Sequence, residues 1–358
     1  MFSLDHYRAA REAAALQDRS SRARVRLTGA DRREYLQGLL TNDIVALGPG
    51  QGCYAALLTA QGRMIADLFV VETGDAILID LEPAAGDKVA AHLERFIFSE
   101  DVHVTTVTAT TAQIGVFGPA ASRAIASVLG NGVRAGDLDG LPVLASRRVQ
   151  RSDPDNLDVL IVRRDDLGVP GFDLVAGKAE AEALMAALRG AGAVAFDDDV
   201  AEVLRVEYGR PRFQQDMSEE TIPLEAGIDD RAISMTKGCY VGQEIIVRVL
   251  HRGHGRVAKK LVGLTLEPSA AVPNHGDRIR AGADDRDIGV VTSAVSSPAA
   301  GRPIALGYVH RDFVEDGTRV TIESGGTRAG ATVRRLPFAA AGWTPAPATA
   351  EPAAPADR

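Results

Sequence analysis

Cysteine is scarce in this sequence of 358 residues, which contains only Cys53 and Cys239. Two cysteines cannot build a disulfide framework for a chain of this length. They also cannot by themselves bind an iron–sulfur cluster or a structural zinc ion, so we expect no metal site. Low cysteine usage is typical of a reducing compartment, and we expect a cytoplasmic protein.

Long apolar runs, aromatic residues and an excess of positive charge are missing as well. No stretch approaches the roughly 20 apolar residues that cross a bilayer, and residues 1–15 lack the apolar core of a signal peptide. The 40 basic and 48 acidic residues give a net charge of −8, and aromatic residues make up 5% of the chain. We therefore expect neither a membrane nor a direct nucleic-acid partner.

The residues that are present have the composition and patterning of a globular protein with helices and strands. Hydrophobic residues make up 46% of the chain and charged residues 25%. Helical spacing follows Asp31 and extends over residues 83–98 and 178–188. Strands are predicted at short apolar runs, residues 76–81, 114–117, 157–162 and 172–175. Because the two kinds of element do not alternate strictly, we expect an α+β fold.

The pattern changes after Gly255, where helical periodicity ends. Short β-rich runs separated by turn residues predict five strands, at residues 257–266, 288–295, 304–309, 319–322 and 331–336. This pattern is typical of a small barrel or sandwich. The last 22 residues contain five prolines and many alanines, which predicts a disordered tail. We thus divide the chain into a body of residues 1–255, a barrel of 256–336 and a tail of 337–358.

The segment from Lys237 to Glu244, Lys-Gly-Cys-Tyr-Val-Gly-Gln-Glu, departs from generic composition. Its two glycines permit a tight turn with Cys239 at the tip. Lys237 favours the thiolate, and a helix opening after the turn would act in the same direction, which would move the thiol pKa from about 8.5 toward roughly 7. The alternative interpretation is that Cys239 is a small apolar residue in a turn.

All eight positions of this segment match the K-G-C-Y-x-G-Q-E signature, and the chain resembles the YgfZ-type folate-binding proteins. These proteins are relatives of the T-protein, the aminomethyltransferase of the glycine cleavage system. Further segments resemble the wider T-protein family in the same order, at residues 36–43, 62–68, 115–119, 204–209, 222–227, 288–293 and 305–309.

The resemblance implies a three-lobed, ring-like body that binds tetrahydrofolate in a central cavity, followed by a small β-barrel. T-proteins transfer a methylene group from an aminomethyl-lipoyl carrier to folate with the help of an aspartate, whose position is occupied here by Asp67. Its carboxylate is expected to bind the pterin or to stabilise a developing iminium; a solvent-facing strand residue is the alternative. Asp173 matches one carboxylate expected against the pterin, and Tyr240 and Gln243 are further expected cofactor-binding residues.

Two other charged residues, Arg205 and Glu207, flank Val206 and follow Leu204. Alternation would place both charges on one face of an extended segment. Arg205 could then pair with a folate carboxylate. A solvated surface pair is an equal alternative.

The sequence also departs from T-proteins. Ala66-Asp67 stands where T-proteins usually have two adjacent aspartates, and residues 168–173 retain only one of the acidic positions of the T-protein strand. These departures favour the YgfZ-type function, in which a folate-binding protein supports iron–sulfur clusters in client enzymes, including those that modify tRNA. The expected partners are then folate and iron–sulfur client or assembly proteins, and the expected catalytic residues are Lys237, Cys239 and Asp67. An aminomethyltransferase and a non-catalytic folate-binding adaptor are the alternatives.

Overall fold

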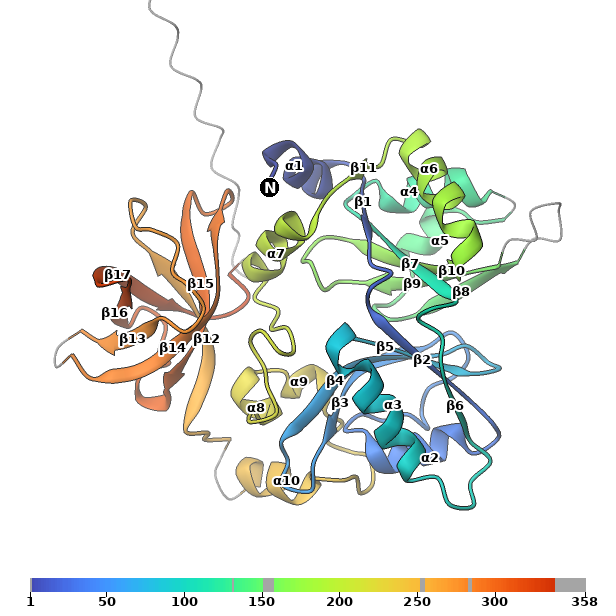
Figure 1. Cartoon of the computed structure of the whole chain (residues 1–358), viewed down its shortest axis with the longest axis horizontal. Coiled ribbons are helices and arrows are strands. Elements are labelled where there is room, and N and C mark those ends of the chain that lie inside the picture. The colour runs from blue at the N-terminus through green and yellow to red at the C-terminus, as the bar shows by residue number, and fades with distance from the viewer. Residues whose placement is uncertain (1, 131, 151–157, 252–254, 283–284, 339–358) are drawn as a thin grey trace, which may run out of the picture. The chain divides into compact units, whose positions relative to one another are not determined.

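The computed structural model describes residues 2–130, 132–150, 158–251, 255–282 and 285–338 (Figure 1). The chain divides into two compact units, each considered by itself. The larger unit comprises Met1–Arg205 and Arg210–Leu261. The smaller unit comprises Val206–Gly209 and the described residues from Val262 onward. Most of the predicted tail, from residue 339, lies outside the described residues.

The larger unit contains two β-sheets. The first has six strands in the order β11 (Val194–Ala195), β1 (Ala15–Asp18), β7 (Thr111–Phe117), β10 (Gly171–Gly177), β9 (Asp158–Arg164) and β8 (Ser146–Gln150). The second has five, in the order β3 (Gly52–Leu58), β4 (Met64–Glu72), β5 (Ile77–Leu81), β2 (Ala23–Thr28) and β6 (His103–Thr106). The pairing of β1 with β7, and of β3 with β4, is antiparallel.

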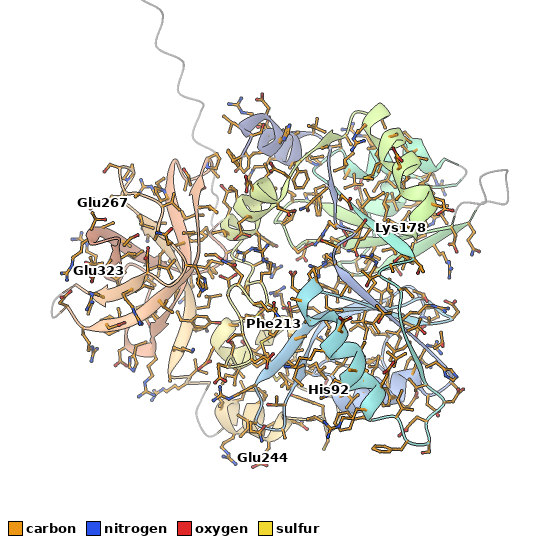
Figure 2. The ribbon with its side chains drawn as sticks, in the orientation of Figure 1. His92, Lys178, Phe213, Glu244, Glu267 and Glu323 are labelled. Carbon is orange, nitrogen blue, oxygen red and sulfur yellow. The ribbon has the colours of Figure 1, made fainter. Side chains whose placement is uncertain are left out.

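Helices cover these sheets: α2 (Arg32–Leu39), α3 (Gly86–Arg95) and α6 (Ala181–Gly190) lie where the apolar spacing predicts helices, and α4 (Ala121–Leu129) is additional. Leu36 of α2 and Val89 of α3 pack in the core of the five-stranded sheet, which also includes Phe213 (Figure 2). Ile125 of α4 and Leu188 of α6 pack in the core of the six-stranded sheet. The α-helices are α1 (Leu4–Glu12), α2 (Arg32–Leu39), α3 (Gly86–Arg95), α4 (Ala121–Leu129), α5 (Ala135–Asp139), α6 (Ala181–Gly190), α7 (Asp198–Glu207), α8 (Pro223–Ala226), α9 (Asp229–Ala232) and α10 (Gln243–His251). Among the described residues, no helix is long and apolar enough to span a bilayer.

The smaller unit is built on a closed barrel, which confirms the barrel expected at this end of the chain. Its strand order is β12 (Lys259–Leu266), β15 (Arg302–His310), β14 (Asp287–Ser297), β13 (Arg278–Ala281), β16 (Arg319–Ser324) and β17 (Thr327–Arg334). Five of these strands coincide with predicted ones, and β13 is additional. Together with the two sheets and their helices, the barrel confirms the α+β class.

A buried network of charges joins the two sheets of the larger unit. Asp80 of β5 belongs to one sheet and Asp173 of β10 to the other. Arg164 binds both carboxylates, at 3.0 Å and 3.2 Å, and Gln113 Nε2 donates to both, at 3.1 Å and 2.8 Å. Burial acts to lower the pKa of Arg164, but its carboxylate neighbours raise that pKa above its ordinary value. The sheets therefore meet through paired charges.

Replacing Asp173 by asparagine tests how far the fold depends on this network. Asp173 is 1% exposed, and the change removes a buried counter-charge of Arg164. We expect the free energy of unfolding, measured by urea denaturation, to fall by about 3 kcal/mol. Asp158→Asn, in an exposed pair with Arg148, is the control and should cost less than about 1 kcal/mol. Equal losses in the two variants would contradict this role of the network.

Candidate functional site

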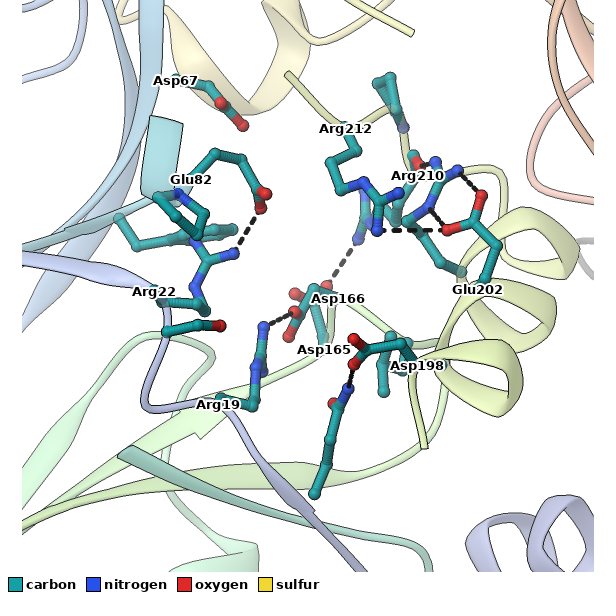
Figure 3. Close-up of a pocket in the computed structure, with 18 of the residues that line it drawn as sticks. Arg19, Arg22, Asp67, Glu82, Asp165, Asp166, Asp198, Glu202, Arg210 and Arg212 are labelled. Atoms are coloured by element: carbon teal, nitrogen blue, oxygen red, sulfur yellow. Dashed lines mark hydrogen bonds and ion pairs between the residues drawn. The ribbon is translucent and has the colours of Figure 1, made fainter. Parts of the chain in front are cut away.

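A cavity of about 270 Å³ lies in the larger unit, lined by residues from both sheets and from α7 and α9. Its wall is dense in charge, with seven acidic residues and six arginines. Figure 3 shows Asp67 and Glu82 on one side and Arg210, Arg212 and Glu202 on the other. The charged lining residues are Asp18, Arg19, Arg22, Asp67, Glu82, Asp165, Asp166, Asp198, Glu202, Arg205, Arg210, Arg212 and Arg231.

Strand pairing brings Tyr54, Asp67 and Phe69 to one face of the five-stranded sheet. Tyr54 of β3 is the cross-strand partner of Phe69 of β4, and their ring centres are 5.0 Å apart. Asp67 lies two residues before Phe69 and therefore points to the same face. The Tyr54 hydroxyl donates a hydrogen bond of 2.8 Å to Asp67 Oδ2. Two aromatic rings and a carboxyl group thus form one wall of the cavity.

Asp67 is 8% exposed and has no ion pair within the described structure. Burial raises its pKa from 3.8 to about 6, although the hydrogen bond from Tyr54 acts to lower it. Burial also raises the pKa of Tyr54 above its ordinary value, so the hydroxyl keeps its proton and remains a donor. One carboxyl oxygen is thereby held in place.

Arg205 also lines the cavity, but its position differs from the prediction. It lies with Glu207 in helix α7 and not on an extended segment. In a helix, residues two apart lie about 200° apart around the axis, so the two charges do not share a face. The alternation of residues 204–207 fits both the strand period of 2 and the helix period of 3.6. Over a longer stretch, Val200, Val203 and Leu204 follow the helix period and are buried.

The guanidinium of Arg205 organises the loop that follows α7. It binds Glu202 through Nε at 3.0 Å and Nη2 at 2.5 Å. Its Nη1 donates to the carbonyl oxygen of Arg210 at 2.5 Å and to Asp216 at 2.7 Å. Arg205 therefore fixes the chain segment that carries Arg210 and Arg212 into the cavity wall.

Glu207 and Asp173, both expected near the pterin, do not line the cavity. Glu207 belongs to the smaller unit, where its carboxylate accepts hydrogen bonds from Ser297 Oγ at 2.5 Å and from the Ala299 backbone N–H at 3.4 Å. The Asp173 carboxylate forms ion pairs with Arg19, at 3.1 Å, and with Arg164 of the inter-sheet network. Their expected roles toward a cofactor stay predictions.

Lys237 attaches the loop before α10 to the end of α2. Its Nζ donates to the carbonyl oxygens of Gln37 and Leu40, both at 2.6 Å, and of Asn42 at 3.0 Å. A cation is favoured there by the partial negative charge at a helix C-terminus. Burial lowers the pKa of Lys237 to about 8. The ammonium thus binds carbonyl oxygens at the C-terminal end of α2 and just beyond it, and its expected effect on the thiolate stays a prediction.

The rest of the motif surrounds an exposed thiol. Cys239 is exposed, whereas Tyr240 is 7% exposed and lies beneath the Lys237 ammonium, 5.2 Å from ring centre to Nζ. Gly242 has a φ of +85°, and a Cβ there would lie 2.5 Å from the Thr59 carbonyl oxygen, so glycine is required. The expected helix opens at Gln243. Lys237, Cys239, Tyr240 and Gln243 do not line the cavity, and their functional roles stay predictions.

Sequence reasoning missed Tyr54 and Arg231. Tyr54 precedes an apolar run, and only its pairing register with Phe69 brings it to Asp67. Arg231 lies in the four-residue helix α9, and its guanidinium carbon is 4.9 Å from the centre of the Tyr54 ring. No spacing in the sequence links these two residues, which are far apart in the chain.

Comparison with known proteins identifies the family. The GCVT N-terminal domain matches residues 2–237, and the glycine cleavage T-protein C-terminal barrel domain matches residues 259–339. An aminomethyltransferase of Rubrobacter xylanophilus is 33% identical over 303 residues, 85% of this chain and 78% of that protein. An aminomethyltransferase of Corynebacterium jeikeium is 29% identical over 354 residues, 94% of this chain and 90% of that protein.

A solved structure shows the same fold. The crystal structure of glycine cleavage system aminomethyltransferase T from Bartonella henselae has a TM-score of 0.84 and 23% identity, covering 94% of this chain and 89% of that one. With both domain matches in the family's order, the chain belongs to the glycine cleavage T-protein family.

Proposed function

We propose that this protein binds a reduced folate in the cavity of its larger unit and acts as a one-carbon transferase of the aminomethyltransferase type. The observation that carries the proposal is the buried carboxyl group of Asp67, which lines the cavity without a cationic partner in the described structure. The names of the relatives from Rubrobacter xylanophilus and Corynebacterium jeikeium support the reaction type.

The residues around Asp67 fit a reduced pterin. The rings of Tyr54 and Phe69 offer apolar contact to a flat heterocycle. A volume of about 270 Å³ is near the lower end of the range for ligand pockets, which begins at roughly 300 Å³. When bound, tetrahydrofolate supplies the nitrogen atoms that accept the one-carbon unit.

Asp67 has two uses in such a reaction. With a pKa of about 6 it is mostly ionised near neutral pH, yet it can hold a proton at little cost. Tyr54 occupies Oδ2, which leaves Oδ1 for an N–H group of the ligand. A carboxylate at this place orients the ligand amine and stabilises positive charge that develops on it.

A second candidate function rests on the exposed thiol of Cys239. It is the hypothesis that the sequence favours, in which a folate-binding protein supports iron–sulfur client enzymes. The names of the relatives give that hypothesis no support. Within the described residues, no group of three or more His, Cys, Asp or Glu side chains is arranged to hold a metal ion. Because the names of the relatives support the transferase, we rank this function below aminomethyl transfer and use the Cys239 thiol to test it.

Asp67→Asn tests the proposed reaction. We expect methylene transfer from an aminomethylated lipoyl carrier protein to tetrahydrofolate to fall at least about a hundredfold, because the amide cannot take a proton or carry the negative charge. The rate of methylenetetrahydrofolate formation measures it. Asp158→Asn, an exposed aspartate outside the cavity, should stay at the wild-type rate. If the wild type binds folate but shows no turnover, the result contradicts the proposed enzyme and favours the non-catalytic folate-binding adaptor.

Ligand affinity should depend on pH through Asp67. Its raised pKa means that the carboxyl group is protonated in the folded protein below about pH 6, where it would still be ionised in the unfolded chain. If the ionised form accepts the ligand N–H, affinity for 5-formyltetrahydrofolate falls by up to about tenfold per pH unit below 6. Calorimetric titrations at pH 5, 6 and 7.5 measure this slope, and Asp67→Asn should abolish it. The same slope in the variant would assign the effect to another group.

Cys239→Ala separates the two candidate functions. Because the thiol lies outside the cavity wall, an aminomethyltransferase should keep its rate within about threefold, a negligible change in barrier. Growth and iron–sulfur enzyme activity in cells lacking the native protein provide the second measurement. Loss of those activities with folate binding intact would favour the iron–sulfur function.

A further inference from the structure

Arg231 differs from the other arginines of the cavity wall in its partners. Five arginines have a carboxylate within ion-pair distance. The nearest distances are 2.6 Å from Arg19 to Asp166, 2.5 Å from Arg22 to Glu82, 2.5 Å from Arg205 to Glu202, 2.6 Å from Arg210 to Asp165, and 3.3 Å from Arg212 to Glu202. Arg231 has no such pair in the described part of the chain, and its guanidinium lies over the Tyr54 ring instead.

The backbone holds Arg231 in place without help from its charge. Asn42 Nδ2 donates to the carbonyl oxygen of Arg231 at 3.0 Å and to that of Tyr54 at 2.8 Å, so one side chain ties α9 to β3. Thr41 Oγ1 donates to the carbonyl oxygen of Ala232 at 2.6 Å. The main chain at Arg231 is therefore fixed beside β3 before any ligand arrives.

Among the residues that the structure describes, no carboxylate lies within ion-pair distance of the Arg231 guanidinium, and Asp165 and Asp230 act on it only from farther away. Arg231 is half-buried, and burial lowers its pKa. A partly desolvated guanidinium presents its N–H donors as a planar fork that matches a carboxylate. Asp67 is in the opposite situation, since it is a buried carboxyl group with one hydrogen bond, from the same Tyr54. One tyrosine thus separates an unpaired cation from an unpaired carboxyl group.

We propose that Arg231 binds a carboxylate of the ligand while Asp67 binds an N–H group of the same ligand. The cavity then selects molecules that carry an amine and a carboxylate on either side of Tyr54. This inference rests on the proposed function, in which the ligand is a reduced folate. The carboxylate then comes from the glutamyl tail of that folate. A small N-alkyl amino acid has the same chemistry and is the other source that the experiment must distinguish.

The test is a double-mutant cycle between protein and ligand. The probes are 5-formyltetrahydrofolate and its glutamyl diamide, which lacks both tail carboxylates, titrated by calorimetry into the wild type and Arg231→Gln. We expect the wild type to bind the diamide at least about tenfold more weakly, and the variant to bind both probes equally. Arg231→Lys keeps the charge without the fork and should discriminate to an intermediate degree. Arg148→Gln, an exposed arginine outside the cavity, is the control and should behave as wild type.

Two results would overturn the inference: a wild type that does not distinguish the probes, or an Arg231→Gln variant that distinguishes them as strongly as the wild type. Thermal unfolding verifies that the variants are folded, and Arg231→Lys replaces Arg231→Gln if the latter is not. A wild type that binds neither probe refutes the proposed function. N-methylglycine is then titrated into the wild type and Arg231→Gln: binding that the variant loses supports the carboxylate role with a small amino acid as its source, and absence of binding overturns it.

Discussion

The hydrogen bond from the Tyr54 hydroxyl to Asp67 is the one partner of a buried carboxyl group in the cavity wall, as far as the described residues show. Asp67 is buried on a strand, where a carboxyl group without a partner is costly. One hydrogen bond satisfies one of its oxygen atoms, and the remaining demand raises its pKa to about 6. A ligand that brings a hydrogen-bond donor would stabilise the ionised carboxylate of Asp67. This makes Asp67 the chemically distinctive residue of the cavity wall.

Within the described ranges of the chain, no cationic side chain forms an ion pair with Asp67, although several arginines lie in the same cavity wall. Arg22 and Arg19 lie in the same wall, but they are engaged by Glu82 and Asp166. Arg205 is engaged by Glu202 and Asp216 and orders the loop after α7. The dense charge of the cavity is thus mostly structural, and Asp67 and Arg231 are the two groups that we propose to contact a ligand.

The fold could largely be predicted from the sequence, because apolar periodicity reports which faces are buried. The helices at residues 86–95 and 181–190 and five barrel strands follow that rule. Strand β13 was not predicted, because it is four residues long and two of its residues are arginines. Arg205 and Glu207 were assigned to an extended segment because a stretch of four residues does not distinguish a period of 2 from one of 3.6.

The site was predictable only in part. Asp67 was found through its family position, but its partner Tyr54 depends on strand register and Arg231 on a hydrogen bond from Asn42. The most direct test of the account is the titration of the Asp67 carboxyl carbon by ¹³C NMR, with and without 5-formyltetrahydrofolate. We expect a pKa near 6 in the free protein that falls when the ligand binds. A pKa near the ordinary 3.8 that the ligand leaves unchanged would contradict it.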